Sequence, residues 1–203
     1  MRFRHHIAAA LALACAIGPG GAHAATYTAN SVIAGDTAYG MCASSSAAKC
    51  KADDRLNSKN ALGETDGKFY ALGLGGILTL GFENAVFRPG AFVTIEEVTF
   101  GGPKGSGHFE AVDVYSVFGN VATFVQTIYN SAVSTTFQVA NRFEYIRLVD
   151  ATLREYSKTR SADGFDVDSV KVTIAPVPIP AAGGFLLAGL GGLALMRRRK
   201  SAA

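Results

Sequence analysis

Short runs of β-branched and aromatic residues, each followed by a glycine-rich or polar break, dominate the middle of the chain. They cover residues 77–82, 92–100, 109–118, 121–129, 143–149 and 165–174. No stretch of 12 or more residues between 25 and 175 has a convincing apolar period of 3.6, so long amphipathic helices are not expected. Runs of this length and spacing predict an all-β domain, a β-sandwich or jelly roll. Gly119-Asn120 predicts a two-residue hairpin turn.

The net charge of the chain is unevenly distributed along its length. The sequence has 19 Lys and Arg and 16 Asp and Glu, a net charge of +3, but six of the basic residues lie at the two ends. The part between them keeps 13 basic and 16 acidic residues and has a net charge of −3. Because a nucleic-acid-binding domain is expected to show a basic patch or stripe, nucleic acid is excluded as a partner.

The N-terminus has the order of parts of a secretory signal peptide. Arg2 and Arg4 precede an apolar run over residues 7–17, and a small-x-small site ends at Ala24. This order predicts a signal peptide over residues 1–24, cleavage between Ala24 and Ala25, and export. The apolar run has 11 residues, too few to span a bilayer. An uncleaved N-terminal anchor is the alternative.

Export determines how the cysteines are interpreted. Cys15 lies in the signal peptide, which leaves Cys42 and Cys50 in an oxidising compartment. Two such cysteines predict one disulfide, whose stabilisation should lie at or below ~3 kcal/mol because the loop is short. A metal pair is not expected, since no histidine or third cysteine is near. Residues 42–60 are polar and irregular, which predicts a surface loop held by the disulfide.

The C-terminus combines a proline-rich spacer, an apolar segment and a basic cluster. Residues 175–180 (APVPIP) place a proline at every second position, which favours an extended spacer. Residues 181–196 carry no charge, and RRRK follows at 197–200. A helix over the apolar segment would be ~24 Å long, short of a ~30 Å hydrocarbon core. The basic cluster is expected to stay on the cytoplasmic side, which places residues 25–175 outside.

The segment VPIPAAGGFLLAGLGGLALMRRRK resembles the PEP-CTERM class of C-terminal sorting signals, in its VPLPA-like variant. The resemblance implies that residues 176–203 form a transient transmembrane anchor. An exosortase, a membrane transpeptidase-like enzyme of Gram-negative bacteria that make exopolysaccharide, would then process it. One departure is Ile179, where the family has leucine or an acidic residue. The sorting-motif residues are Val177, Pro178, Ile179, Pro180, Arg197, Arg198 and Arg199. A periplasmic protein that keeps its tail as an anchor is the alternative.

Four segments of the central part are similar to galactose-binding-like (discoidin-like) extracellular domains, which are often joined to such a tail. They are residues 60–76 (NALGETDGKFYALGLGG), 97–101 (EVTFG), 145–150 (YIRLVD) and 163–170 (DGFDVDSV). The resemblance implies a β-sandwich of that class, and fold alone does not establish that a sugar is bound. We expect a non-catalytic protein of the cell surface or extracellular matrix, associated with exopolysaccharide or other glycans.

The last apolar run places carboxylates beside the core. Side chains of a strand alternate between its two faces, which places Val170, Val172 and Ile174 on one face. The same alternation puts Asp166 and Asp168 on that face if no bulge intervenes. A buried charge must be paired, hydrogen-bonded or metal-bound.

Two further carboxylates join this group. Val93 and Ile95 place Glu97 inward by the same alternation, and Asp66 lies in a glycine-flanked loop. Because calcium takes six to eight oxygen ligands, we hypothesise a structural calcium site that draws on some of the four carboxylates. The resemblance also implies structural calcium without fixing its ligands. The candidates are Asp66, Glu97, Asp166 and Asp168. Alternatively, they cap turns, lie at the rim or pair with Arg142 or Arg147; melting with and without a chelator distinguishes the two.

Catalytic residues are scarce. His108 is the one histidine between residues 25 and 175, and it follows Gly-Ser-Gly, which predicts an exposed turn residue. A Ser-His-Asp arrangement would need it, yet no G-x-S-x-G motif accompanies it, and one histidine rules out a multi-histidine metal site. The alternative to a non-catalytic protein is a secreted hydrolase that uses Glu97 and Asp166, which would require these two carboxylates to face one another.

Aromatic platforms for sugars are also few. Tryptophan is absent, and tyrosines at strand positions are more often core or sheet surface than binding platforms. The available tyrosines are Tyr70, Tyr115, Tyr129, Tyr145 and Tyr156. We therefore expect any binding site in the loops at one end of the sandwich.

Overall fold

The computed structural model describes residues 24–43, 48–98, 107–176 and 189. Ala24–Ala175 forms one compact unit. The predicted signal peptide and sorting signal lie outside the described residues, except for Ala24, Pro176 and Gly189, and stay predictions. Among the described residues, no helix has the length and apolarity needed to cross a membrane.

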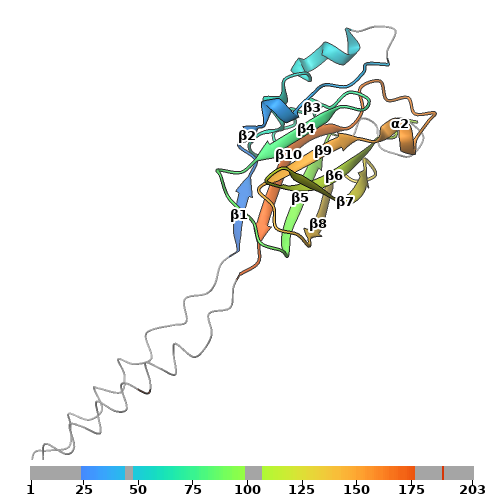
Figure 1. Ribbon diagram of the computed structural model, residues 1–203. Coiled ribbons are helices and arrows are strands. Elements are labelled where there is room, and N and C mark those ends of the chain that lie inside the picture. Colours follow the sequence, from blue (N-terminus) through green and yellow to red (C-terminus); the bar gives the residue numbers. More distant parts are fainter. Residues whose placement is uncertain (1–23, 44–47, 99–106, 177–188, 190–203) are drawn as a thin grey trace, which may run out of the picture. The chain divides into compact units, whose positions relative to one another are not determined.

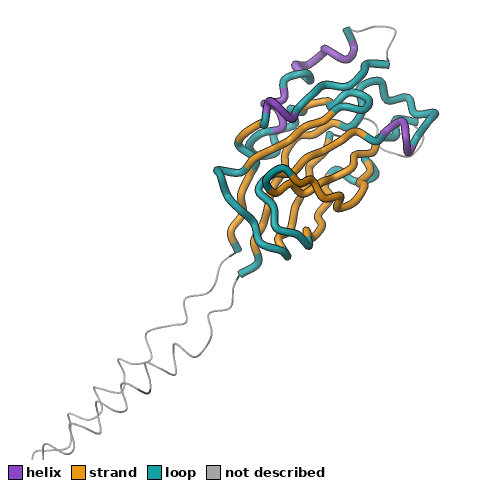
Figure 2. The backbone as a smooth tube through the Cα atoms, in the orientation of Figure 1, coloured by secondary structure: helices purple, strands orange, loops and turns teal. Residues whose placement is uncertain are grey.

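The described strands form two antiparallel sheets that share one core, so the predicted β-sandwich is confirmed (Figures 1 and 2). In sheet A the order is β1 (Ala25–Thr28), β10 (Asp166–Ile174), β5 (Ala91–Glu97) and β8 (Ser134–Val139), and β3 (Tyr70–Ala71) also pairs with β10. In sheet B the order is β2 (Ser31–Val32), β4 (Ile77–Gly81), β9 (Tyr145–Asp150), β6 (Ala111–Phe118) and β7 (Val121–Tyr129).

Helical structure in the described residues is confined to short segments. One α-helical turn, α2 (Thr152–Glu155), follows β9. Ala34–Asp36, Lys49–Asp54 and Ser58–Ala61 form 3₁₀ segments, the second of which is broken by a kink. The last two lie in the polar stretch that we expected to be an irregular loop.

All six predicted runs contain a strand, and the predicted turn at Gly119-Asn120 joins β6 to β7. The sequence did not reveal β1, β2, β3 or β8. The first three are too short to show a period. In β8 the residues are mostly polar and exposed because the strand lies at the edge of sheet A, so only Phe137 and Val139 give an apolar signal.

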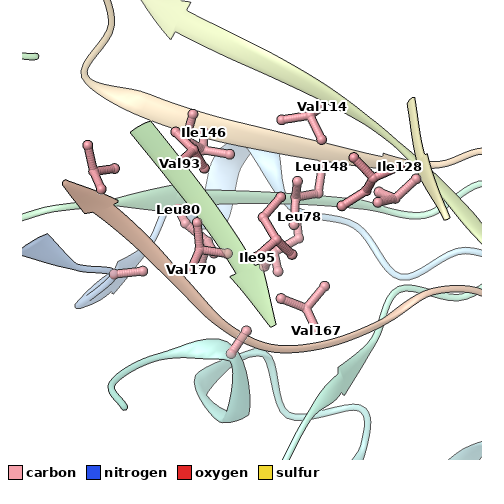
Figure 3. Close-up of a cluster of buried hydrophobic side chains, with 14 of the residues drawn as sticks. Leu78, Leu80, Val93, Ile95, Val114, Ile128, Ile146, Leu148, Val167 and Val170 are labelled. Carbon is pink, nitrogen blue, oxygen red and sulfur yellow. The ribbon is translucent and has the colours of Figure 1, made fainter. Parts of the chain in front are cut away.

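A β-bulge in β10 changes which side chains enter the core. Val167 pairs with Glu97 and Ser169 with Glu96, so β10 has one extra residue at this point. Val167 and Val170 both lie in the core, although they are three residues apart (Figure 3). A regular strand would direct them to opposite faces. The prediction that Asp166 shares the apolar side with Asp168 and Val170 is therefore wrong, because it assumed no bulge.

The two ends of the sandwich differ chemically. The end where Ala25 pairs with Ile174 carries aromatic rings, including Phe87 and Phe143, whose centroids are 4.9 Å apart. At the opposite end, which we call the loop end, β10 and β6 begin and β5 and β9 finish (Figure 1). Charged side chains are buried there.

The predicted disulfide between Cys42 and Cys50 is confirmed, with the two Cα atoms 6.1 Å apart. It lies at the loop end, because the amide of Ala43 donates to the carbonyl of Ala162 at 2.7 Å. The disulfide loop is thus attached to the segment that precedes β10.

Candidate functional site

Asp150, the last residue of β9, connects three loops at the loop end. Its Oδ1 accepts hydrogen bonds from the amides of Gly75 at 3.0 Å and Thr152 at 3.2 Å. Its Oδ2 accepts from the hydroxyl of Thr152 at 2.7 Å and the amide of Phe165 at 3.0 Å. Burial raises the pKa of Asp150, and these donors oppose the rise because they stabilise the ionised form. Asp150 thereby fixes the loops around it.

Four further carboxylates form a buried group beside Asp150, which we call the carboxylate cluster. Each is at most 4% exposed. Its members are Glu97, Glu110, Asp163 and Asp166. They come from four places in the chain: the end of β5, the residue before β6, the loop before β10 and the first residue of β10. Burying several like charges together is costly unless they are paired or protonated.

Two basic side chains, Arg55 and His108, pair with members of the carboxylate cluster. Nη1 of Arg55 lies 2.8 Å from Oδ2 of Asp163, and the guanidinium lies over the ring of Phe69 at 5.1 Å. Nε2 of His108 lies 2.8 Å from Oε1 of Glu110. This contact raises the pKa of His108 above 6.5, against the effect of burial. The contribution of His108 to stability is therefore present at acid pH and is lost as the pH rises through its raised pKa.

Asp166 differs from Asp163 and Glu110 in its hydrogen bonding. Both carboxylate oxygens are buried and have no hydrogen-bond partner among the residues that the structure describes. Burial, followed by repulsion from Glu110, Asp163 and Glu97, raises the pKa of Asp166 well above 3.8, while Arg55 opposes the rise. The fold therefore favours the protonated form of Asp166 more than water does.

A polar pocket of about 440 Å³ lies at the loop end, and Asp163 is the member of the carboxylate cluster that lines it. Lys49 and Arg160 are exposed residues of its lining, whereas the side chain of Asp163 is 6% exposed. The lining residues are Ala43, Lys49, Cys50, Arg55, His108, Thr159, Arg160, Ser161, Ala162 and Asp163. The disulfide and the ion pairs thus hold the walls of one cavity.

Two other pockets, of about 590 and 500 Å³, lie beside β1 and β2. Each has a single charged side chain, Glu83 in one and Lys59 in the other. The loop-end pocket is the one of the three where several charged groups converge, which makes it the better candidate for a binding site.

The polar residues of the site do not form a catalytic triad. The hydroxyl of Ser161 donates to Oε1 of Glu110 at 2.7 Å and accepts from the amide of Gly164 at 3.1 Å. Its proton is directed to the carboxylate and not to His108, as an activated serine would require. His108 lies at the pocket wall and pairs with Glu110, so the expectation of a merely exposed turn residue is wrong.

The two carboxylates that the hydrolase alternative requires, Glu97 and Asp166, are not accessible to solvent. Glu97 is 2% exposed and Asp166 is 1% exposed. The two carboxylates are close enough for Glu97 to raise the pKa of Asp166, but both are closed off from solvent. The prediction that Glu97 points inward is confirmed. Because a glycosidic bond must lie between the two carboxyl groups, residues closed off from solvent do not fit that role.

The four calcium candidates separate into two pairs. Oδ1 and Oδ2 of Asp168 accept from the amides of Asp66 at 3.2 Å and Gly67 at 2.9 Å, so Asp168 caps this turn. The carboxylate of Asp66 is 54% exposed and lies near Lys68. Glu97 and Asp166 belong to the carboxylate cluster. The described residues contain no group of three or more suitable ligands, so the four do not fit a single calcium site. Calcium on part of the set stays a prediction.

Sequence reasoning missed the residues that build the pocket. Asp150 and Asp163 stood inside the segments that resemble the galactose-binding-like class, which was a signal that they have a role. No sequence pattern indicated that Arg55, Lys49 and Arg160 line a pocket, because they belong to no motif and are brought together only by the fold. Tyr70 is buried in the core, as expected for a strand tyrosine, and no tyrosine lines the pocket.

No family model matches the chain, and no curated protein matches it. Several solved structures are similar to it at low identity. The family 32 carbohydrate-binding module (CBM) of C. perfringens NanJ, in complex with galactose, is 10% identical, with 75% of this chain and 93% of that chain covered and a TM-score of 0.42. A mutant lectin binding domain of lectinolysin, complexed with Lewis b, is 10% identical and has a TM-score of 0.39. The match covers 77% of this chain and 93% of that chain. The CBM35 of Paenibacillus barcinonensis is 13% identical and has a TM-score of 0.32. The match covers 74% of this chain and 99% of that chain. At identities of 10–13% and TM-scores below 0.5, these likenesses say nothing about the function of the chain.

Gly164 provides a test of the Asp150 network. It has a φ of +71°, and a Cβ there would lie 2.5 Å from Oδ2 of Asp150. We expect Gly164→Ala to lower the free energy of unfolding by at least about 1–2 kcal/mol, measured by chemical denaturation. Gly63→Ala is the matched control, because Gly63 also has a positive φ, +89°, while a Cβ there meets nothing within 4 Å. Equal stabilities of the two variants would contradict the role given to Asp150.

The raised pKa of Asp166 makes a second prediction. A carboxyl group whose pKa is higher in the folded than in the unfolded state destabilises the fold as the pH rises through that interval. We therefore expect Asp166→Asn to raise the unfolding midpoint at pH 8, and the gain to vanish near pH 4. Asp168→Asn should lower the midpoint at both pH values, because an amide offers one acceptor oxygen to two backbone donors. A midpoint for Asp166→Asn at or below wild type at pH 8 refutes the assignment.

Proposed function

We propose that the domain is a non-catalytic carbohydrate-binding module of the galactose-binding-like class, and that the loop-end pocket is its binding site. The observation that carries the proposal is the convergence of fixed charged groups, Arg55, His108 and Asp163, in one solvent-accessible cavity. Exopolysaccharide or another glycan is the proposed ligand.

The chemistry of the pocket suits a sugar. Hydroxyl groups both donate and accept, and the pocket offers guanidinium and ammonium donors beside a carboxylate acceptor. A volume of about 440 Å³ lies within the ~300–1,000 Å³ of ordinary small-molecule sites. Arg55 and Asp163 are held by each other, so binding costs little side-chain ordering at these positions.

Export and processing complete the proposal. The predicted cut between Ala24 and Ala25 leaves β1 whole, since β1 begins at Ala25. Ala25 pairs with Ile174, so both ends of the domain lie away from the loop end, and neither approaches the pocket. We propose that the chain is exported, held briefly in the inner membrane by residues 176–203, and processed there by an exosortase-like enzyme for the cell surface.

Binding is tested with the exported chain on an array of neutral and acidic glycans, followed by titration calorimetry with the best glycan. We expect Arg160→Ala and Lys49→Ala each to weaken binding about tenfold or more, because a hydrogen bond from a charged donor contributes ~1.5–3 kcal/mol. Lys158→Ala, at an exposed position outside the pocket lining, is the control and should bind as wild type. Binding that survives both pocket substitutions would place the site elsewhere; turnover of the glycan would contradict the non-catalytic proposal.

Processing is tested by intact-mass analysis of the protein recovered from membranes and medium. We expect the dominant species to begin at Ala25 and to lack Arg197, Arg198 and Arg199. A dominant species that retains the arginines would favour the tail-anchored alternative, and one that begins at Met1 would contradict cleavage of the signal peptide.

A further inference from the structure

The loop-end pocket is lined mainly by basic groups, although the domain around it is acidic. Five of the lining side chains carry ionisable groups, and four of these are basic. They are Lys49, Arg55, His108 and Arg160, against the single carboxylate of Asp163. The part of the chain between the two basic ends has a net charge of −3, so the pocket gathers basic side chains against the overall sign. A cavity lined by one sign of charge attracts ligands of the opposite sign.

Ion pairs account for two of the four basic groups. Arg55 pairs with Asp163, whose side chain is 6% exposed. His108 pairs with Glu110, which is buried and does not line the pocket. The positive charges of the other two basic side chains therefore remain in the lining.

The other carboxylates of this region do not line the pocket. Glu97 is 2% exposed and Asp166 is 1% exposed, and both lie outside the lining. Asp53 is exposed and lies 3.4 Å from Arg55, but it also stands outside the lining. A ligand in the pocket therefore meets basic side chains and, among the described carboxylates, only that of Asp163.

The hydroxyl groups of the lining are already used by the fold. The hydroxyl of Thr159 donates to the carbonyl of Phe109 at 2.6 Å and accepts from the amides of Phe109 and Ser161. The hydroxyl of Ser161 donates to Glu110 and accepts from the amide of Gly164. Lysine and arginine side chains only donate hydrogen bonds, whereas a sugar hydroxyl both donates and accepts. The lining therefore suits a ligand group that only accepts, such as a carboxylate or a sulfate.

The backbones at Lys49 and Arg160 are held in place, although both residues are exposed. Lys49 precedes the buried Cys50, which the disulfide joins to Cys42. The amide of Arg160 donates to the carbonyl of Gly107 at 2.8 Å, and a Cβ at Gly107 would lie 3.2 Å from Cδ of Arg160. Basic groups on fixed segments lose less conformational entropy when they bind an anion than groups on mobile segments do.

We propose that the loop-end pocket selects acidic glycans, and that Lys49 and Arg160 bind the anionic substituent of one sugar residue. The substituent is a carboxylate, as in a uronic acid, or a sulfate ester, because both present acceptor oxygens and a negative charge. The inference rests on the proposed carbohydrate binding and adds the class of glycan. The net negative charge of the rest of the domain repels an acidic polymer, which favours its engagement through the pocket.

The first test compares acidic polymers with neutral counterparts by titration calorimetry on the exported chain. The carboxylate probes are polygalacturonate, alginate and hyaluronate, each also in a carboxyl-reduced form whose carboxylates have become primary alcohols. The sulfate probe is dextran sulfate, with dextran as its counterpart. We expect at least one acidic probe to bind about tenfold or more tightly than its counterpart, because hydrogen bonds to a charged acceptor are the stronger ones. Preference for a polyuronate identifies a uronic acid, and preference for dextran sulfate identifies a sulfate ester.

The second test separates charge from hydrogen bonding. Lys49→Gln and Arg160→Gln keep a donor but remove the charge, and each should weaken binding of the acidic probe about tenfold or more. Lys49→Arg keeps the charge and should bind more tightly than Lys49→Gln. Lys158→Gln, at an exposed position outside the lining, is the matched control and should bind as wild type. Unfolding midpoints of all variants show whether each remains folded.

The outcomes distinguish this inference from the proposed function. Neutral counterparts that bind as tightly as the acidic probes, and that lose binding in Lys49→Ala and Arg160→Ala, would leave carbohydrate binding in place and overturn the selection of acidic glycans. Acidic probes that bind Lys49→Gln and Arg160→Gln as tightly as wild type would indicate general attraction to the surface and would also overturn it. If no glycan binds, neutral or acidic, the proposed function fails together with the inference.

Discussion

The four hydrogen bonds to the buried carboxylate of Asp150 organise the loop end of the sandwich. They join the turn that contains Gly75, the start of α2 and the residues before β10. Asp163 stands one residue before Gly164, whose missing side chain lets the loop approach Asp150. The position of Asp163 fixes that of Arg55, and the two form part of the pocket wall. The candidate site therefore depends on a carboxylate that does not itself line the cavity.

The contrast between the two ends of the sandwich follows from what each end contains. Aromatic rings close the end where the domain begins and finishes, and apolar burial there needs no partner groups. The loop end buries charges, which must be paired or protonated and therefore reduce stability unless the geometry is satisfied. A protein that retains such a costly arrangement usually does so for function, which is consistent with the proposal that the loop-end pocket, lined by Asp163, is a binding site.

The sequence alone determined the sandwich, the hairpin at Gly119-Asn120, the Cys42–Cys50 disulfide and the inward direction of Glu97, because these depend on alternation, turn chemistry and nearby residues. It also predicted the two terminal sorting segments, which the described residues do not test. Only the tertiary structure decided the rest. The bulge that brings Val167 into the core leaves no mark on the alternation pattern, and β8 is too polar to show a period. The pocket brings together Arg55, His108 and Asp163 because loops distant in sequence meet at one end of the sandwich, and the sequence pattern does not show which loops meet.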